Sequence, residues 1–198
     1  QVNLLKKYFE RLNIPYEVIS FPQYGKNEYS KKIKDYLEGK FGKLAEVDPY
    51  VVAKFYAADR LTAKDLIKSW LNDGKLVIAN RYVSASKAHL GANLPDEKKE
   101  EFITWVDKLE YKDNGLPIPN LTILLKVDPN VGQENARKDN LVDLHEQNIV
   151  HEQKAAQIYL KLSQAEEDWV VVDCMEDGEM KSKDEIHQEI ISYLKKMV

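Results

Sequence analysis

Two hydrophobic patterns alternate along the chain, one typical of amphipathic helices and one typical of buried strands. From the first residue onward, Val2, Leu5, Phe9 and Leu12 repeat at the spacing of one helix face. Other apolar runs are short, rich in β-branched residues and without this repeat, at residues 16–21, 76–79, 121–127 and 169–172. Strands that are apolar on both faces are typical of a covered parallel sheet, so these runs predict buried parallel strands.

Helices are predicted between and after these strands. Asp48 and Pro49 are typical of an N-cap and a first helical turn, and Gly74 is typical of a helix end. Ser182 and Glu185 form a capping-box pattern that opens the last helix. The predicted helices cover residues 1–12, 29–37, 48–74, 96–109, 131–138, 143–162 and 182–194, and residues 80–94 are predicted to be a loop that leads into a further helix. The alternation predicts one α/β domain over residues 1–198, with an open, mostly parallel sheet and right-handed crossovers.

Composition excludes several classes of protein. The 29 Lys and Arg residues against 33 Asp and Glu give a net charge of −4, so the chain as a whole is not a surface for nucleic acid or an anionic membrane. No apolar run approaches the roughly 20 residues of a membrane-spanning helix. A single cysteine, Cys174, excludes a disulfide framework within the chain. We therefore expect a soluble cytoplasmic protein without a nucleic-acid or membrane partner.

The first predicted helix lacks a start signal of its own. No Ser, Thr or Asp cap and no strand or turn precedes Val2, although the first N–H groups of a helix need partners. We therefore expect that the printed sequence begins inside an element whose earlier part lies upstream.

Candidate chemistry follows the predicted strands. In an open parallel sheet, ligands bind beyond the carboxyl ends of the strands. Tyr24 follows the first predicted strand, Arg81 the second, Asp128 the third and Asp173 the fourth. An unpaired buried guanidinium is costly, so an arginine directly after a buried strand needs a bound anion or an internal carboxylate. Arg81 is thus either a phosphate ligand or one partner of a structural salt bridge.

Tyr56 and Arg60 lie one helical turn apart on the predicted helix at residues 48–74, and residues four apart share a helix face. An aromatic plane beside a fork of N–H donors can hold a nucleobase by stacking and hydrogen bonding. Alternatively, Tyr56 belongs to the core and Arg60 pairs at the surface with Asp59 or Asp65.

Arg137 and Lys138 lie in the charged stretch 132–143, which is the segment of the chain that best fits a mobile flap. They either bind phosphate or form a solvated helix face.

The histidines give no clear signal. His145, on the helix after the flap, is a core histidine, a surface histidine or a ligand, and its local sequence does not decide among them. The others, His89, His151 and His187, are too scattered along the sequence to suggest a zinc site. A catalytic thiol is not expected, because no histidine partner is signalled for Cys174.

Six motifs occur in a fixed order. They are Phe21-Pro-Gln-Tyr24-Gly25, Tyr56-Ala-Ala-Asp59-Arg60, Val77-Ile-Ala-Asn80-Arg81-Tyr82-Val-Ser, Asp128-Pro-Asn-Val-Gly132-Gln-Glu-Asn-Ala-Arg137, Asp143-Leu-His-Glu146 and Trp169-Val-Val-Val-Asp173. Each motif alone is weakly specific, but their order and spacing together resemble the thymidylate kinase family from residue 1 to the last helix. The resemblance implies a P-loop fold of the nucleoside monophosphate kinase type, a three-layer α/β sandwich. It also implies that the first strand and a G-x-x-x-x-G-K-[ST] loop come before the opening helix.

The resemblance implies roles for the acceptor side of a kinase site. Tyr56 matches the aromatic residue that stacks on thymine, and Arg60 matches the arginine that hydrogen-bonds the base. Ser86 falls where a polar side chain meets the base edge. His145 falls where a residue lies against the sugar and disfavours a 2′-hydroxyl.

The phosphates are assigned in the same way. Arg81 matches the arginine that binds the acceptor phosphate, and Tyr24 matches a position near that phosphate. Arg137 and Lys138 match the lid, at about residues 132–143, which closes over the phosphates of ATP. The catalytic residues are therefore expected to be Arg81, Arg137 and Lys138.

The activity implied is transfer of the γ-phosphoryl group of ATP to dTMP, giving dTDP and ADP for dTTP synthesis, with Mg²⁺ and in a cytoplasmic homodimer. The chain departs from the family pattern at Asn80, where an aspartate is usual, and at Ala85, His89 and Leu90. Two alternatives stay open: a kinase for another deoxynucleotide or deoxynucleoside, and a relative that binds nucleotide without catalysis.

Overall fold

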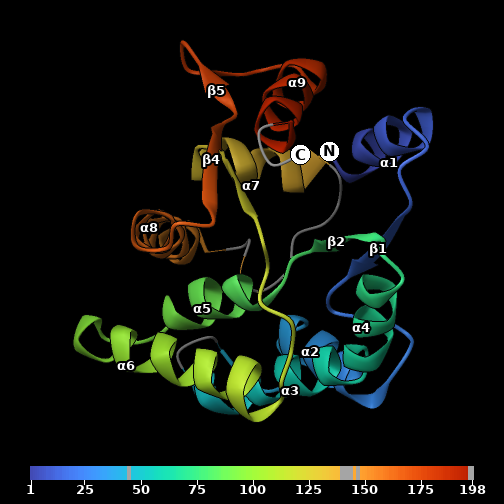
Figure 1. Ribbon diagram of the computed structural model, residues 1–198. Helices are drawn as coiled ribbons and strands as arrows, with labels where there is room; N and C mark the ends of the chain where they lie inside the picture. The colour runs from blue at the N-terminus through green and yellow to red at the C-terminus, as the bar shows by residue number, and fades with distance from the viewer. Residues whose placement is uncertain (44–45, 139–144, 146–147, 196–198) are drawn as a thin grey trace.

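The computed structural model describes residues 1–43, 46–138, 145 and 148–195 (Figure 1). Its helices are α1 (Val2–Arg11), α2 (Glu28–Leu37), α3 (Pro49–Leu61), α4 (Lys64–Asn72), α5 (Val83–Gly91), α6 (Asp96–Asp107), the π-helical turn η2 (Lys108–Asp113), α7 (Pro129–Lys138), α8 (Ile149–Ala165) and α9 (Lys183–Leu194). Its strands are β1 (Tyr16–Ser20), β2 (Leu76–Asn80), β3 (Thr122–Lys126), β4 (Trp169–Asp173), β5 (Met175–Glu176) and β6 (Glu179–Met180).

The four predicted strands are confirmed, and they form two parallel pairs. β1 pairs with β2, with Tyr16 opposite Leu76, and β3 pairs with β4, with Thr122 opposite Trp169. Among the described residues no hydrogen bond joins the two pairs, so they form separate two-stranded sheets rather than one continuous sheet. β5 and β6 add a small antiparallel hairpin that the hydrophobic pattern did not predict.

β2 and β3 are less buried than their apolar sequences predict. Both are half-buried over their first three residues and exposed over their last two. In the part of the chain that the structure describes, each of these strands pairs with one neighbour only, so no strand covers its other edge.

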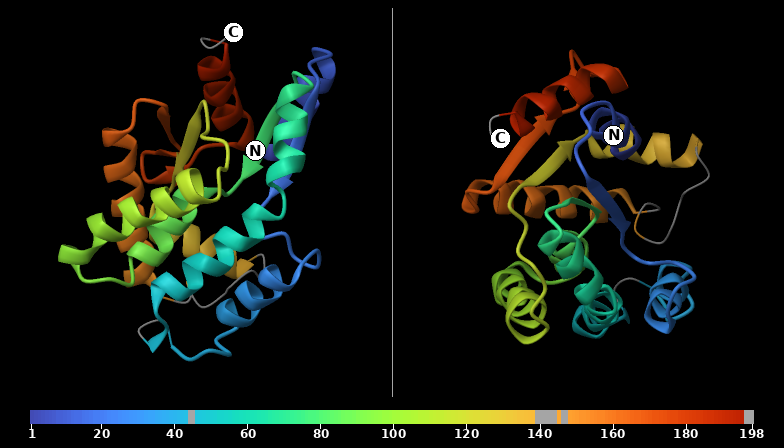
Figure 2. Two further views of the ribbon diagram at one scale, coloured as in Figure 1. Left: turned by 60° about the horizontal axis from the view of Figure 1, so that its bottom comes forward. Right: turned by 45° about the vertical axis from the view of Figure 1, so that its right-hand side comes forward.

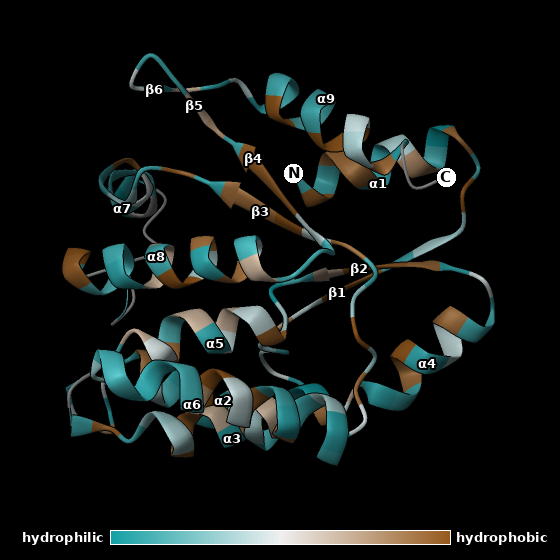
Figure 3. Cartoon of the chain, turned by 60° about the vertical axis from the view of Figure 1, so that its left-hand side comes forward, coloured by the Kyte–Doolittle hydropathy of each residue, from teal (hydrophilic) through white to brown (hydrophobic). Residues whose placement is uncertain are grey.

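The helices form layers on the two sides of the strands, as expected for a three-layer α/β fold. α1 and α9 lie on one side, and α5 and α8 lie on the other, with α2, α3 and α6 beyond α5 (Figures 2 and 3). The layer of α1 and α9 is joined to the strands by one apolar cluster that includes Phe9, Val172 of β4 and Ile190. A second cluster, including Ile33, Val52 and Phe102, holds α2, α3 and α6 together.

The long helix predicted over residues 48–74 is wrong in one respect, because it is broken into α3 and α4 at Thr62 and Ala63. The Thr62 hydroxyl donates to the backbone oxygen of Asp59 at 2.7 Å and accepts from the Gln23 side chain at 2.9 Å. A threonine hydroxyl bonded to a nearby carbonyl competes with regular helix geometry. Asp48 caps α3 as predicted, accepting from the backbone N–H of Tyr50.

The other helix predictions are confirmed with shifted ends. α8 begins at Ile149, where the Asn148 side chain caps it, and not at residue 143. Residues 139–143 of the expected lid, and most of the chain from there to 147, lie outside the described residues. The capping box at Ser182 and Glu185 is present as predicted. Within the described residues, none of the helices is long and apolar enough to cross a membrane.

Candidate functional site

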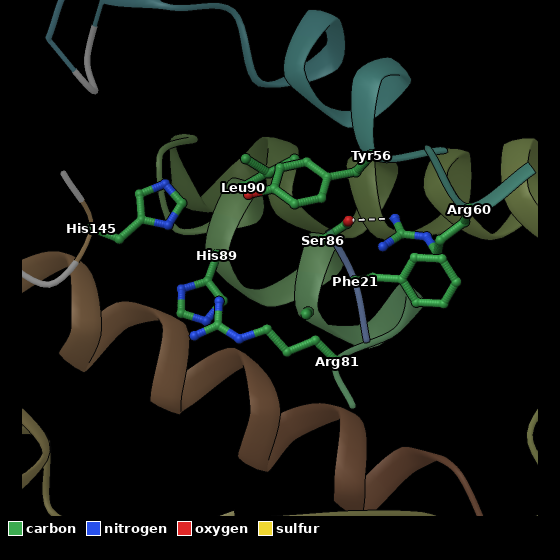
Figure 4. A pocket seen from close by; sticks show the side chains of 9 residues that line it. Phe21, Tyr56, Arg60, Arg81, Ser86, His89, Leu90 and His145 are labelled. Atoms are coloured by element: carbon green, nitrogen blue, oxygen red, sulfur yellow. Dashed lines mark hydrogen bonds between the residues drawn. The ribbon is translucent and has the colours of Figure 1, made fainter. Parts of the chain in front are cut away.

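A pocket opens beyond the carboxyl ends of β1 and β2, as the rule for parallel sheets predicts (Figure 4). It encloses about 320 Å³ of empty space, part of it open to solvent. The residues that line it come from the ends of the two strands, from α3 and α5, and from the segment before α8: Phe21, Tyr56, Arg60, Arg81, Ala85, Ser86, His89, Leu90 and His145. Five of the eight residues selected from the sequence therefore meet in one cavity.

Arg60 is fixed deep in the pocket wall. Its side chain is only 1% exposed, and it forms an ion pair with Glu110, which is also 1% exposed. The Nε atom donates to Glu110 Oε1 at 3.0 Å, Nη2 donates to Ser86 Oγ at 2.6 Å, and Nη1 donates to the backbone oxygen of Tyr82 at 3.4 Å. Burial is the largest single influence on the pKa of Arg60 and lowers it, but the charge of Glu110 and its hydrogen bond, with smaller contributions from Tyr82 and Tyr56, together raise that pKa above its usual value. The guanidinium is thus a fixed cation.

The alternative partners considered for Arg60 are therefore wrong. Arg60 is buried, so it does not pair at the surface with Asp59 or Asp65. Asp59 is fully buried and accepts from the backbone N–H of Gln23 at 3.0 Å and from Asn27 Nδ2 at 2.7 Å. Asp59 therefore joins the loop after β1 to α3, and the carboxylate that pairs with Arg60 is that of Glu110.

Tyr56 lies between the pocket and the core. Its ring is half-buried, packs against the core cluster of α2, α3 and α6, and also lines the cavity. The guanidinium carbon of Arg60 lies 5.8 Å from the ring centroid. The shared helix face predicted for Tyr56 and Arg60 is confirmed, and both residues face the pocket (Figure 4).

Arg81 follows β2 in a left-handed backbone conformation, with φ of 60°. Residues other than glycine seldom adopt this conformation because it is strained. Residues with a strained backbone of this kind are found mainly at functional sites. The Arg81 side chain is exposed, lines the pocket and extends toward His89 (Figure 4). Burial and the charge of Arg81 together lower the pKa of His145 to about 4, so at neutral pH this imidazole is uncharged.

The histidines are closer together than their sequence positions suggested. His89, His145 and His151 each offer a ring nitrogen within 4.8 Å of the others. The expectation that the histidines are too scattered for a metal site is therefore wrong for His89 and His151. α5 and α8 pack side by side, and this packing brings residues 62 positions apart into one cluster. His187 lies apart from it, on α9.

The structure does not bring the other three predicted residues to the pocket wall. Tyr24 is 52% exposed in the loop after β1. On α7, Arg137 donates to Gln133 at 2.9 Å and Lys138 pairs with Glu134 at 2.9 Å. Both of these α7 cations are exposed. Their predicted contact with ATP phosphates stays a prediction.

The described pocket wall does not fit a protein-held Mg²⁺ ion. Mg²⁺ prefers carboxylate, phosphate and water oxygens. None of the nine lining residues named above carries a carboxylate, and Asn80, at the end of β2, has an amide instead.

Two contributors to the site were given no role by the sequence. Glu110, the partner of Arg60, lies in η2, where the helical repeat of α6 changes to a π turn. Such turns are often found at functional sites. Gln23 anchors the loop after β1 through Asp59 and Thr62.

Comparison with known proteins gives one consistent result. The family model described as thymidylate kinase matches residues 1–190. The chain is 27% identical to a thymidylate kinase of Mycobacterium tuberculosis over 151 residues, covering 73% of this chain and 70% of the relative. It is 28% identical to a probable thymidylate kinase of Methanosphaera stadtmanae over 196 residues, covering 98% and 92%.

A third relative has a higher sequence identity to the chain. The chain is 30% identical to a probable thymidylate kinase of Methanocaldococcus jannaschii over 165 residues, covering 83% of this chain and 76% of the relative. The resemblance drawn from the six motifs is thereby confirmed, and with it the fold type. The chain belongs to the thymidylate kinase family.

Proposed function

We propose that the protein transfers the γ-phosphoryl group of ATP to dTMP, giving dTDP and ADP. The observation that carries the proposal is a single cavity faced by an aromatic ring, a buried arginine and an exposed arginine. Phosphoryl transfer needs little covalent assistance and depends on positioning and on fixed positive charge. These three side chains can supply both for a nucleoside monophosphate.

Recognition of the base falls to Tyr56, Arg60 and Ser86. A base stacks on the Tyr56 ring, which α3 holds in place. The guanidinium of Arg60 has five N–H donors, and its contacts with Glu110, Ser86 and Tyr82 use four of them. One N–H of Nη1 is left for a carbonyl oxygen of the base, and Glu110 keeps the fork from turning.

Binding of the acceptor phosphate falls to Arg81. Its exposed guanidinium stands at the pocket and can form a paired hydrogen bond with a phosphate. The uncharged imidazole of His145 lies on the same wall, where it can contact the sugar. Arg137 and Lys138 are proposed to act on the phosphates of ATP, and Tyr24 to lie near the acceptor phosphate.

The remaining parts of the proposal rest on the family alone. They are Mg²⁺ as cofactor, a homodimer and a cytoplasmic location. Size-exclusion chromatography with light scattering tests the dimer directly. Loss of turnover on chelation, restored by added Mg²⁺, tests the ion.

The test of the activity is a coupled assay of ADP release with the full-length protein. The acceptors are dTMP, dUMP, dCMP, dGMP and thymidine, each with ATP. We expect dTMP to give the highest kcat/KM. Turnover of thymidine but not of dTMP would contradict the proposal and favour a nucleoside kinase, and a preference for another monophosphate would correct the base.

A second function, nucleotide binding without catalysis, is favoured by one observation. Asn80 stands at the end of β2 where the family usually has an aspartate, and a neutral amide does not replace a carboxylate near a metal. Thermal stabilisation by dTMP without any ADP release would support this function. The variant Asn80→Asp separates the two, since it should create turnover only if the amide is the defect.

A further inference from the structure

We propose that His89, His145 and His151 form a binding site for a zinc ion on the wall of the pocket, with the carboxylate of Glu152 beside His89 as the fourth donor. The three imidazoles come from the end of α5, from a residue four positions before α8 and from the first turn of α8. Their nearest ring nitrogens all lie within 4.8 Å of one another. The proposal is independent of the kinase reaction, because it rests on the histidines and not on the nucleotide.

The donor set suits zinc in its chemistry. Imidazole nitrogens and a carboxylate oxygen are the ligands of Zn²⁺ in tetrahedral sites, with Zn–N distances of about 2.0–2.1 Å. A carboxylate oxygen of Glu152 lies 3.8 Å from Nδ1 of His89. Within the described part of the chain, this Nδ1 atom is buried and accepts or donates no hydrogen bond. A buried ring nitrogen in that condition is a ready ligand.

The geometry is close to that of a bound site. Tetrahedral angles at those bond lengths place ligand nitrogens about 3.3 Å apart, so the cluster would contract by roughly 1.5 Å at most. The ring centroids lie 4.4 Å apart for His145 and His151, 5.4 Å apart for His89 and His145, and 5.8 Å apart for His89 and His151. Modest rotations of three imidazoles can provide that contraction.

Two neighbours already orient the rings from outside. Asn93 Oδ1 lies 2.9 Å from Nδ1 of His151, which puts a proton on Nδ1 and directs the lone pair to Nε2. The Tyr36 hydroxyl lies 2.9 Å from Nε2 of His145. Metal-binding histidines characteristically have such a second hydrogen bond, which fixes the tautomer and the ring. Asn93 and Tyr36 are therefore positioning residues for this site.

The charges around the cluster oppose each other. Arg81 repels a cation, and it also helps burial to hold the pKa values of His89 and His145 below the usual value. The carboxylate of Glu152 supplies the negative charge that offsets Arg81.

The test is calorimetric titration of Zn²⁺ into the full-length protein after removal of metal by chelation, without nucleotide. We expect one ion per chain with a Kd of about 1 µM or tighter. Co²⁺ in place of Zn²⁺ should give the visible absorption of a tetrahedral ion. The variant His151→Gln should weaken binding by about 100-fold, and Glu152→Gln and Asn93→Ala by about 10–100-fold each.

The matched control is His187→Gln, since His187 is a buried histidine on another helix. It should bind Zn²⁺ as the parent protein does. If a histidine variant fails to fold, Glu152→Gln still tests the site, because it replaces a partly exposed side chain by one of the same size. Binding weaker than about 100 µM, or an equal loss in His187→Gln, would overturn the proposal. Neither result depends on whether dTMP is phosphorylated.

Discussion

Arg60 and Arg137 both lie near the end of a helix, yet their surroundings differ in every respect. Arg60 is 1% exposed and is held by Glu110 and Ser86, whereas Arg137 is exposed and bonds to Gln133 one turn earlier on its own helix. A buried guanidinium with fixed partners has its position before any ligand binds. An exposed guanidinium takes its final position only when it binds a ligand. The acceptor side of the proposed reaction is therefore preformed, and the α7 side is not.

The largest effect is expected at Glu110, where the variant Glu110→Leu leaves the buried charge of Arg60 without its partner. We expect a loss of about 3–5 kcal/mol in the free energy of unfolding, measured by urea denaturation. The double variant Glu110→Leu/Arg60→Met should recover most of this loss, because it removes both charges.

The control for Glu110 is Asp113, one turn away in η2 and paired with Lys108 at the surface. Asp113→Asn should cost about 0–1 kcal/mol, as exposed ion pairs do. Equal losses in the two variants would show that Arg60 is not held by a buried pair.

The next effect concerns turnover, through Arg81. Asparagine tolerates the left-handed backbone, so Arg81→Asn removes the charge while retaining the local conformation. We expect kcat/KM for dTMP to fall by about 2–4 kcal/mol of transition-state stabilisation. Steady-state kinetics within a factor of about two of the parent protein would remove Arg81 from the phosphate site.

A smaller effect is expected at Tyr56. Tyr56→Ala removes the ring and should weaken dTMP binding by about 1–3 kcal/mol, measured by calorimetry. Tyr56→Phe keeps the ring and should retain most of the affinity. If both variants bind dTMP as the parent protein does, the ring belongs only to the core.

The smallest effect, at Arg137, tests the other half of the comparison. Arg137→Ala should change the free energy of unfolding by no more than about 0.5 kcal/mol, because the side chain is exposed. It should leave dTMP affinity unchanged and lower kcat by about tenfold, or about 1.4 kcal/mol. A loss of stability instead of a loss of kcat would contradict the assignment.

The sequence was sufficient wherever a local rule applies. The helix face of α1, the cap at Asp48 and the four parallel strands follow from spacing and residue type, and all are present. Position after a parallel strand was also enough to select Arg81, and helical spacing was enough to join Tyr56 to Arg60.

The sequence was insufficient where distant elements meet. The pairing of Arg60 with Glu110 joins residues 50 positions apart, and no local pattern specifies it. The histidine cluster depends in the same way on the packing of α5 against α8. The break between α3 and α4 was missed because the competing partners of Thr62 include Gln23, a residue 39 positions earlier.

Because Arg81 has a left-handed backbone, the amino acids that best support folding at this position should differ from those that best support activity. For the amount of folded protein in a cell, glycine and asparagine should outrank valine and isoleucine, whose branched side chains crowd that conformation. For growth that depends on the enzyme, arginine alone should rank high. A saturation library scored both by abundance and by survival would therefore separate what the backbone at this position favours from what the reaction requires.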